Sequence, residues 1–208
     1  PEDDWADSPT PPASQECPDI LAALEVISQR SAPQKDWEKN QDYVPSLRRA
    51  RLGWLNLAGA DCSNIEMINS DLRGAHLSGA NFSGAQLIGA QLGWAYLTEA
   101  NLSEADLSTA NLMGADLRWA NLSRANLSPA NLNGANLGAA NLNGVNLSGA
   151  ILSAVNFNRA NLSGTNLSGT YLSEAKNLTQ AQIDDACVQK GSSPPELPDG
   201  LKPPTKIC

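Results

Sequence analysis

Leucine, or a residue that can replace it in an apolar interior, recurs at every fifth position from Leu47 to Leu172. Most units follow the frame Ala-Asn-Leu-Ser-Gly with small changes, as in the segments 100–104 and 160–164. A unit this short can bury its apolar residues only by stacking on neighbouring units. The repeat therefore predicts a solenoid and excludes a globule packed from long elements.

A period of five excludes a continuous helix and a continuous strand. Five residues of α-helix turn through about 500°, so successive leucines would lie roughly 140° apart around the helix axis. In an uninterrupted strand the side chains alternate between faces, so every second leucine would point into water. We therefore expect each unit to be a short extended side followed by a corner, with leucine always facing inward.

The residues that replace the repeated leucine and alanine predict a narrow, filled interior. Leucine gives way only to Cys62, Met67, Phe82 and Phe157, all of which can occupy an apolar core. The alanine two places earlier is replaced mostly by other small residues. We expect no space for a ligand inside the solenoid, and therefore no cofactor.

Several residues that lie twenty positions apart would form favourable pairs if four sides made one coil. These pairs are Arg51 with Asp71, Glu104 with Arg124, and Ile68 with Ile88. One column of the same spacing would be an uninterrupted ladder of asparagines, at positions 81, 101, 121, 141 and 161. Asparagine can stabilise such a stack by hydrogen bonding along the ladder or to its own backbone.

These features resemble the pentapeptide-repeat family, whose consensus is a small residue, Asn or Asp, Leu or Phe, a polar residue and a variable one. The repeat frame spans about residues 50–174 and covers some three-fifths of the chain. The resemblance implies an all-β solenoid, namely a right-handed quadrilateral β-helix of about six coils, each rising about 4.8 Å. This is the fold class that we predict.

Composition divides the chain into four segments. Residues 1–16 are acidic and proline-rich and should be disordered. Residues 17–46 should hold a capping helix, indicated by an apolar stripe at helical spacing, and a polar connector. Residues 47–174 are the repeat, and residues 175–208 should hold a second capping helix and a proline-rich tail. Short α-helical caps are expected at both ends, because an open coil exposes unpaired backbone and apolar core.

Two signals locate the C-terminal helix. Lys176 shifts the five-residue register by one position, and Thr179 followed three residues later by Gln182 matches a capping box. The helix should open at Thr179 and end near Cys187. The segment also resembles the C-terminal closure of other pentapeptide-repeat proteins.

The four cysteines allow three pairings. We favour a disulfide between Cys187 and Cys208, which would close a loop of about twenty residues and stabilise the cap by roughly 3 kcal/mol. Cys62 occupies a leucine position, where a buried thiol behaves as a small hydrophobe, and a bond to Cys17 is the less favoured alternative. A disulfide favours an exported, oxidising location such as the periplasm or a lumen, and without one the cytoplasm fits equally well.

The sequence lacks the residue sets that catalysis and metal binding require. His76 is the only histidine, and its place in a position where other units carry Asn or Asp favours a structural role. No cysteine pair has metal-ligand spacing, and the serines have no base beside them. We interpret the densest group of acids as partners of Arg118 and Arg124 in surface ion pairs; the group comprises Glu99, Glu104, Asp106 and Asp116. The sequence therefore predicts neither an enzyme nor a metal site.

The resemblance also implies an alternative function, because some members of the family mimic duplex DNA and modulate type II topoisomerases. Eight acids and five arginines between residues 50 and 174 give the coil a net charge of −3. Duplex DNA of about 30 Å carries roughly 18 negative charges, so the charge density disfavours mimicry. The net charge of −8 for the whole chain disfavours nucleic-acid binding. No apolar run is long enough to span a membrane.

The most informative surface residues are apolar. In a four-sided coil Trp54 and Trp94 share a corner, Tyr96 lies just around it, Met113 lies one coil further on, and Trp119 is on the neighbouring side. Large exposed apolar patches mark interaction sites, although the connector 34–46 or the C-terminal tail would cover them equally well. We interpret the chain as a non-catalytic scaffold that binds a protein partner through these five residues. The partner and the oligomeric state do not follow from the sequence.

Overall fold

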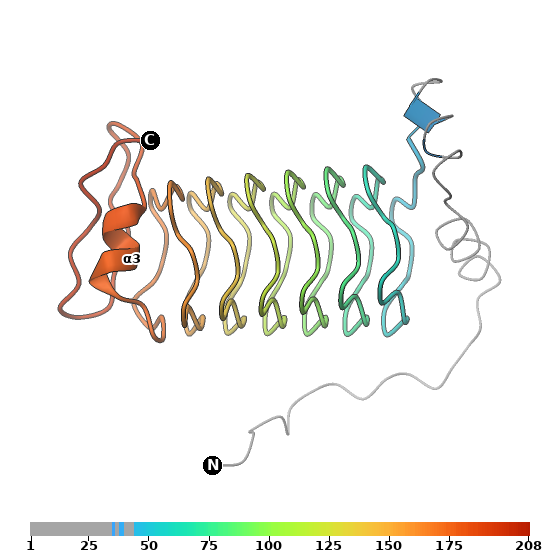
Figure 1. Cartoon of the computed structure of the whole chain (residues 1–208), viewed down its shortest axis with the longest axis horizontal. Helices are drawn as coiled ribbons and strands as arrows, with labels where there is room; N and C mark the ends of the chain where they lie inside the picture. Colours follow the sequence, from blue (N-terminus) through green and yellow to red (C-terminus); the bar gives the residue numbers. More distant parts are fainter. Residues whose placement is uncertain (1–34, 36–37, 40–43) are drawn as a thin grey trace, which may run out of the picture.

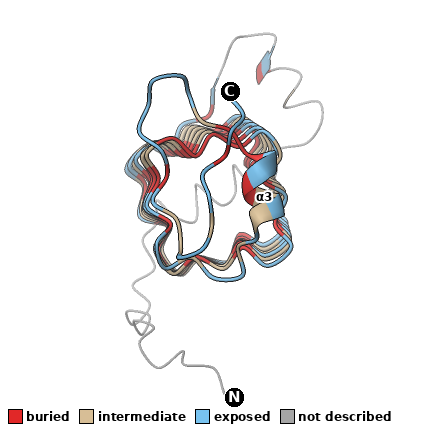
Figure 2. Cartoon of the chain, turned by 90° about the vertical axis from the view of Figure 1, so that its left-hand side faces the viewer, coloured by how far each residue is buried: buried red, intermediate tan, exposed pale blue. Residues whose placement is uncertain are grey.

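The computed structural model describes residues 35, 38, 39 and 44–208. From Ser46 onward the chain winds into a stack of four-sided coils, seen from the side in Figure 1 and from the C-terminal end in Figure 2. Each side pairs in parallel with the side twenty residues later, beginning with Ser46 to Glu66 and Arg51 to Asp71. Units of five with pairing at twenty give four sides per coil, as the stacking pairs predict.

We name the four faces of the stack by their first bridging residue. Face A begins at Ser46, face B at Arg51, face C at Asn56 and face D at Asp61, and each continues in steps of twenty residues. The bridging residues lie on the outside, while the leucine that follows and the alanine that precedes each of them are buried along most of the stack. Every face therefore presents one regular column of outward side chains.

One continuous hydrophobic core fills the stack. The buried residues from Leu52 to Leu172 form a single cluster in which leucines and alanines from all four faces meet. The four residues that replace leucine lie in the same cluster with exposures of 1% or less; they are Cys62, Met67, Phe82 and Phe157. Burying one leucine side chain stabilises a fold by about 2 kcal/mol, so the inward columns are the main source of stability.

Each corner is a tight turn in which the alanine N–H donates to the carbonyl of the leucine three residues earlier, as from Ala120 to Leu117 at 3.1 Å. The residue just before the alanine has a positive φ at nearly every corner, which explains why glycine is frequent there. The three tryptophans of the coil occupy this position as well, with φ of 64° at Trp54, 55° at Trp94 and 58° at Trp119. A bulky residue in this conformation costs about 1 kcal/mol relative to glycine.

The predicted asparagine ladder is present on face D. From Asn101 to Asn161, each Nδ2 donates to the Oδ1 of the asparagine one coil earlier at 3.0 to 3.2 Å. The ladder starts at Asp61, which accepts from Asn81 at 3.3 Å. Each Oδ1 also accepts from the backbone N–H two residues later, as from Ser103 at 3.2 Å. Asparagine at the outward position therefore stabilises both the stack and the corner.

The twenty-residue register ends after Lys176. Asn166 pairs with Cys187, 21 residues later, and α3 (Gln180–Asp185) lies in the stretch between them. The helix lies across the C-terminal end of the stack, in the stretch of sequence where the next side of face D would fall (Figures 1 and 2). It opens with the predicted capping box, and it ends two residues earlier than expected because Cys187 returns to the ladder.

Gln182 links α3 to the last complete coil. Its Nε2 donates to the carbonyls of Phe157 and Ala160, both at 2.9 Å, while its Oε1 accepts from the Thr179 N–H at 2.9 Å. In other coils the corresponding alanine carbonyl accepts from a backbone N–H of the next coil, as Ala140 does from Asn161 at 3.0 Å. The Gln182 amide therefore replaces a backbone donor that the helix removes.

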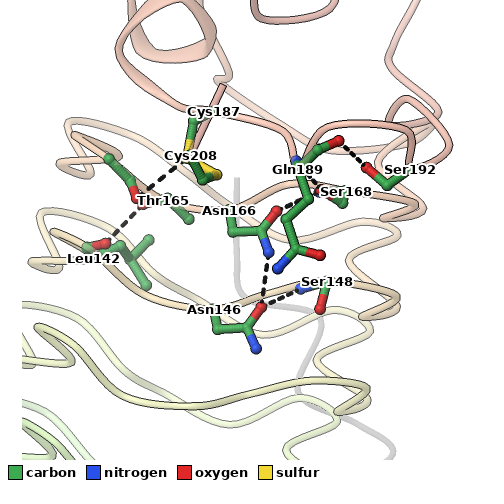
Figure 3. The surroundings of a disulfide bond; sticks show 11 residues. Leu142, Asn146, Ser148, Thr165, Asn166, Ser168, Cys187, Gln189, Ser192 and Cys208 are labelled. Atoms are coloured by element: carbon green, nitrogen blue, oxygen red, sulfur yellow. Dashed lines mark hydrogen bonds between the residues drawn. A yellow bond between two sulfur atoms is a disulfide. The ribbon is translucent and has the colours of Figure 1, made fainter. Parts of the chain in front are cut away.

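A disulfide joins Cys187 to Cys208, the pairing that the sequence favours (Figure 3). It lies beside a short parallel pairing between Val188 and Ile207, so the chain end is held against the last coil. Cys62 is buried in the first coil. Its alternative partner Cys17, the expected tail 1–16 and most of the expected cap and connector in 17–46 lie outside the described residues.

Replacing Ser70 with alanine is expected to raise the free energy of unfolding by about 1 kcal/mol. Ser70 occupies an inward alanine position, and its buried Oγ has no hydrogen-bond partner in the part of the chain that the structure describes. Alanine removes the desolvated hydroxyl and leaves almost no cavity. Denaturant unfolding measures the change, and Thr165→Val is the matched control. The Thr165 Oγ1 donates to the Leu142 carbonyl at 2.7 Å, so this variant should lose stability. A loss in Ser70→Ala would contradict the expectation.

Candidate interaction surface

Trp54 and Trp94 lie two coils apart in the corner between faces B and C. Each ring packs against the glycine one coil further on. A Cβ at Gly74 would lie 2.5 Å from the Trp54 ring, and one at Gly114 would lie 2.9 Å from the Trp94 ring. This packing leaves both tryptophans half-buried. The alternation of tryptophan and glycine in this corner is therefore explained partly by packing within the chain.

Two aromatic side chains stack on face C, at the outward position just after this corner. His76 and Tyr96 occupy successive rungs, with ring centroids 4.7 Å apart and an angle of 14° between their planes. Tyr96 is 43% exposed, and His76 is exposed as well. Later rungs of the same face carry asparagine, with Asn156 donating to Asn136 at 3.1 Å. The stack thus places exposed rings on a face whose later rungs carry hydrogen-bonded asparagines.

Trp119 stands at the far corner of face C, one coil further along, and is 56% exposed. The Arg118 guanidinium lies 5.4 Å from the centroid of its ring, a cation–π arrangement. Asp116 holds the same guanidinium through bonds of 2.8 Å from Nε and 2.7 Å from Nη2. Because of these contacts the cation and the indole are held side by side on the surface.

The pKa of the Asp116 carboxyl is shifted by its surroundings. Burial alone would raise its pKa, but hydrogen bonds from the Arg118 side chain and backbone, the Arg118 charge and a hydrogen bond from Thr98 hold the pKa below its ordinary value. The hydrogen bond that Arg118 donates to Asp116 in turn raises the pKa of Arg118. The stabilisation from Asp116 is therefore present above the ordinary carboxyl pKa and is lost as the pH falls through the lowered value. At neutral pH the pair is fully charged.

The five residues selected from the sequence thus divide into two sets. Tyr96 and Trp119 are exposed at face C, whereas Trp54 and Trp94 lie half-buried in the corner between faces B and C, and Met113 lies half-buried on face B. We call His76, Tyr96, Arg118 and Trp119 the aromatic face. Sequence reasoning did not assign His76 to this surface and overlooked two exposed residues of face B, Ile151 and Tyr171. The sequence signal that could have identified these three residues is that each stands at an outward position where many units carry asparagine.

The described part of the chain holds no group of three or more His, Cys, Asp or Glu placed to bind a metal ion. Within the same residues, no helix is long and apolar enough to cross a bilayer.

A four-sided parallel coil with leucine inside and asparagine ladders outside defines a β-helix of five-residue repeats. The model of the family described as pentapeptide repeats matches eight copies in this sequence, over residues 46–84, 56–92, 90–128, 130–169 and 150–189. The chain therefore belongs to the pentapeptide-repeat family, and its fold is the right-handed β-helix solenoid of that family.

Several solved structures resemble the chain. HetL, involved in heterocyst differentiation regulation in the cyanobacterium Nostoc, is 31% identical over 71% of this chain and 76% of its own, with a TM-score of 0.38. A pentapeptide repeat protein from the Arabidopsis thaliana thylakoid lumen is 31% identical over 57% of this chain and 69% of its own, with a TM-score of 0.43. The plasmid-mediated fluoroquinolone resistance protein QnrB1 is 23% identical over 78% of this chain and 86% of its own, with a TM-score of 0.41. No curated protein sequence matches the chain.

Proposed function

We propose that this chain is a non-catalytic scaffold that binds a protein partner through the aromatic face. The observation that carries the proposal is the exposure of Tyr96 (43%) and Trp119 (56%) on one face of a rigid stack. Tyr96 stands at an outward position where many units carry asparagine, and Trp119 stands where glycine would avoid a strained φ. Neither residue is the one that the repeat prefers at its position, which favours a role in contacts with another molecule. Tyr, Trp and Arg are also the residues most enriched at the energetic centres of protein interfaces.

The pairing of the surface acids supports a non-catalytic role. Carboxyls that pair with a neighbouring cation on an outer surface are ordinary ion pairs, in contrast to the carboxyls that act as general acids or bases on a bound substrate. Five of the eight acids of the coil form ion pairs with a lysine or an arginine; these pairs are Lys35–Asp61, Arg48–Glu66, Arg73–Asp71, Arg124–Glu104 and Arg118–Asp116.

The same ion pairs weigh against the alternative of a DNA mimic that modulates a type II topoisomerase. A mimic presents unneutralised negative charge in register with phosphates, and here the paired acids leave few free carboxylates on any face. A supercoiling assay checks this point directly. Inhibition or protection of the topoisomerase by the purified chain would favour the alternative over the scaffold.

We propose further that α3 and the C-terminal tail cap the stack. Ile183 and Ala186 join the hydrophobic core cluster with exposures of 0%, which supports a role in covering the last coil. The disulfide of the tail supports a location in an oxidising compartment such as the periplasm or a lumen, because such bonds persist there.

The test of the scaffold uses residues that the repeat itself prefers. Tyr96→Asn and Trp119→Gly together should reduce the recovery of the partner by at least tenfold, since truncating a central Tyr or Trp typically costs 2 kcal/mol or more of binding. The melting temperature should stay equal or rise. Recovery is measured by quantitative mass spectrometry after capture from the source cells with wild-type and variant chains.

Arg124→Gly is the matched control for this experiment. Arg124 also occupies a positive-φ corner, with φ of 60°, but it lies beyond face D, away from the aromatic face. Its substitution should leave capture unchanged. Equal recovery with the double variant, or equal loss with the control, would reject the aromatic face as the binding surface.

A further inference from the structure

Face B carries two exposed apolar side chains that the repeat does not require. Ile151 and Tyr171 occupy successive rungs and are 42% and 47% exposed. Earlier rungs of this face are polar, and Asn111 donates to Gln91 at 3.2 Å. Ile151 and Tyr171 give up such hydrogen bonds and leave apolar surface in water, which indicates a contact with another molecule.

The other end of face B is basic. Arg51 forms its first rung and Arg73 lies one coil further on, while Arg48 and Arg49 stand at the corner just before it; all four are exposed. Two acids lie among them, because Asp71 holds Arg73 through a 2.7 Å contact and Glu66 pairs with Arg48 at 3.7 Å. This end therefore presents an excess of positive charge.

The C-terminal end of face B is acidic as well as apolar. Glu174 lies three residues after Tyr171, at the corner between faces B and C, and is exposed. Glu196 pairs with Tyr171 in the ladder and is exposed too. One face thus carries a basic patch at its start and an acidic, apolar patch at its end.

We propose that a second copy of this chain binds face B, so that two solenoids pack antiparallel about a twofold axis. Arg51 and Tyr171 each lie three coils from Asn111, or about 14 Å along the stack. A twofold axis that lies in the interface, parallel to the sides and level with Asn111, therefore places Arg51 of each copy against Tyr171 of the other. Glu196 lies one coil beyond Tyr171. Guanidinium groups stack well on tyrosine rings and pair with carboxylates.

The opposite orientation is unfavourable. A parallel twofold pair would bring the arginines of both copies together at one end and the glutamates together at the other, and like charges across an interface are destabilising. The antiparallel arrangement instead makes the same patch self-complementary, as a twofold interface requires.

The size of the face predicts weak association. The rungs from 51 to 171 span about 29 Å at 4.8 Å per coil, and a five-residue side is at most about 16 Å wide at 3.3 Å per residue. The contact would bury at most about 460 Å² on each copy, below the standard size of specific protein interfaces. We expect a dissociation constant in the micromolar range that rises with salt, because the end charges are screened.

Sedimentation equilibrium of the full chain from about 1 to 300 µM, a range around micromolar affinity, tests the association. The mass should rise from monomer to dimer and no further. The double variant Ile151→Asn/Tyr171→Asn installs the residue that the repeat prefers, so it should keep the melting temperature and weaken dimerisation at least tenfold. A monomer throughout the range, or a dimer that this variant leaves unchanged, would overturn the proposal.

Cysteine cross-linking tests the register. Met113 lies beside Asn111 on the proposed axis, so Met113→Cys should form a linked dimer under mild oxidation. Gly93→Cys and Asn133→Cys lie one coil to either side of Met113. In the antiparallel dimer each of these positions faces the other, so a mixture of the two variants should cross-link far more than either variant alone. Ser103→Cys, on face D, is the control. Linking of Ser103→Cys at the rate of Met113→Cys, or equal linking of each flanking variant alone, would reject the antiparallel arrangement.

The aromatic face and face B are separable in these experiments. Tyr96→Asn/Trp119→Gly should leave the dimer intact, and Ile151→Asn/Tyr171→Asn should leave partner capture intact. Failure of one surface therefore does not decide the other.

Discussion

Replacing Gln182 with alanine is expected to lower the free energy of unfolding by about 3 kcal/mol. The side chain closes the capping box on Thr179 and donates to two carbonyls of the last coil, those of Phe157 and Ala160. Alanine leaves these groups without the donors and acceptor that Gln182 supplies, at a place where α3 has removed the next side of the coil. Urea unfolding followed by circular dichroism measures the loss.

Two further variants separate the roles of Gln182. Gln182→Glu retains an acceptor for the Thr179 N–H, and glutamate is a good capping-box residue, but it cannot donate to Phe157 and Ala160. It should therefore lose most of the same stability. Gln189→Ala removes a glutamine whose structural contacts come from its backbone, and should change stability by less than about 0.5 kcal/mol. If Gln182→Glu were as stable as the wild-type chain, the amide donors would not hold the helix to the coil.

Reduction of the Cys187–Cys208 disulfide is expected to cost about 3 kcal/mol. The bond closes a loop between residues 21 positions apart. Reducing it raises the conformational entropy of the unfolded chain and so stabilises the unfolded state. Within the folded protein, the Cys208 N–H donates to the Val188 carbonyl at 3.1 Å and the Val188 N–H donates to the Lys206 carbonyl at 3.0 Å, so the disulfide adds to a short ladder that aligns the tail with the last coil. Thermal unfolding with and without a dithiol measures the effect.

The serine variant of Cys208 provides the control. Cys208→Ser removes the same bond without a reductant, so its untreated form should melt below the untreated wild-type chain by a similar margin. A wild-type chain whose melting temperature is insensitive to the dithiol would show that the tail contributes no stability through the bond.

Much of the fold followed from one periodicity. Inward leucine and alanine were predicted because they depend on side-chain direction and on spacing along the chain, which the sequence states directly. The four-sided coil was implied by the family resemblance and indicated by pairs twenty residues apart, and the Asn81 to Asn161 ladder follows from four sides. The capping box at Thr179 was predicted from spacing too, since its two partners lie three residues apart. The end of α3 was placed two residues too late, because the return of Cys187 to the ladder is a tertiary constraint.

The candidate surfaces were predicted less completely. The sequence placed Trp54 and Trp94 in one corner but gave no sign that each ring lies on a glycine of the next coil and is half-buried there. It also treated His76 alone, whereas the structure stacks it on Tyr96. The exposure of an outward side chain depends on the residues that stack on it from the neighbouring coils, and these residues are twenty positions away in the sequence.

The sequence by itself determined the repeat unit, the inward columns and the turn at each corner, since these are local properties of five residues. Only the tertiary structure decided which outward side chains meet, how far each is exposed, and how Gln182 replaces the backbone donors of the missing side. The physical reason is that a solenoid forms its core from local repetition, whereas its surface is assembled by stacking residues that are distant along the chain.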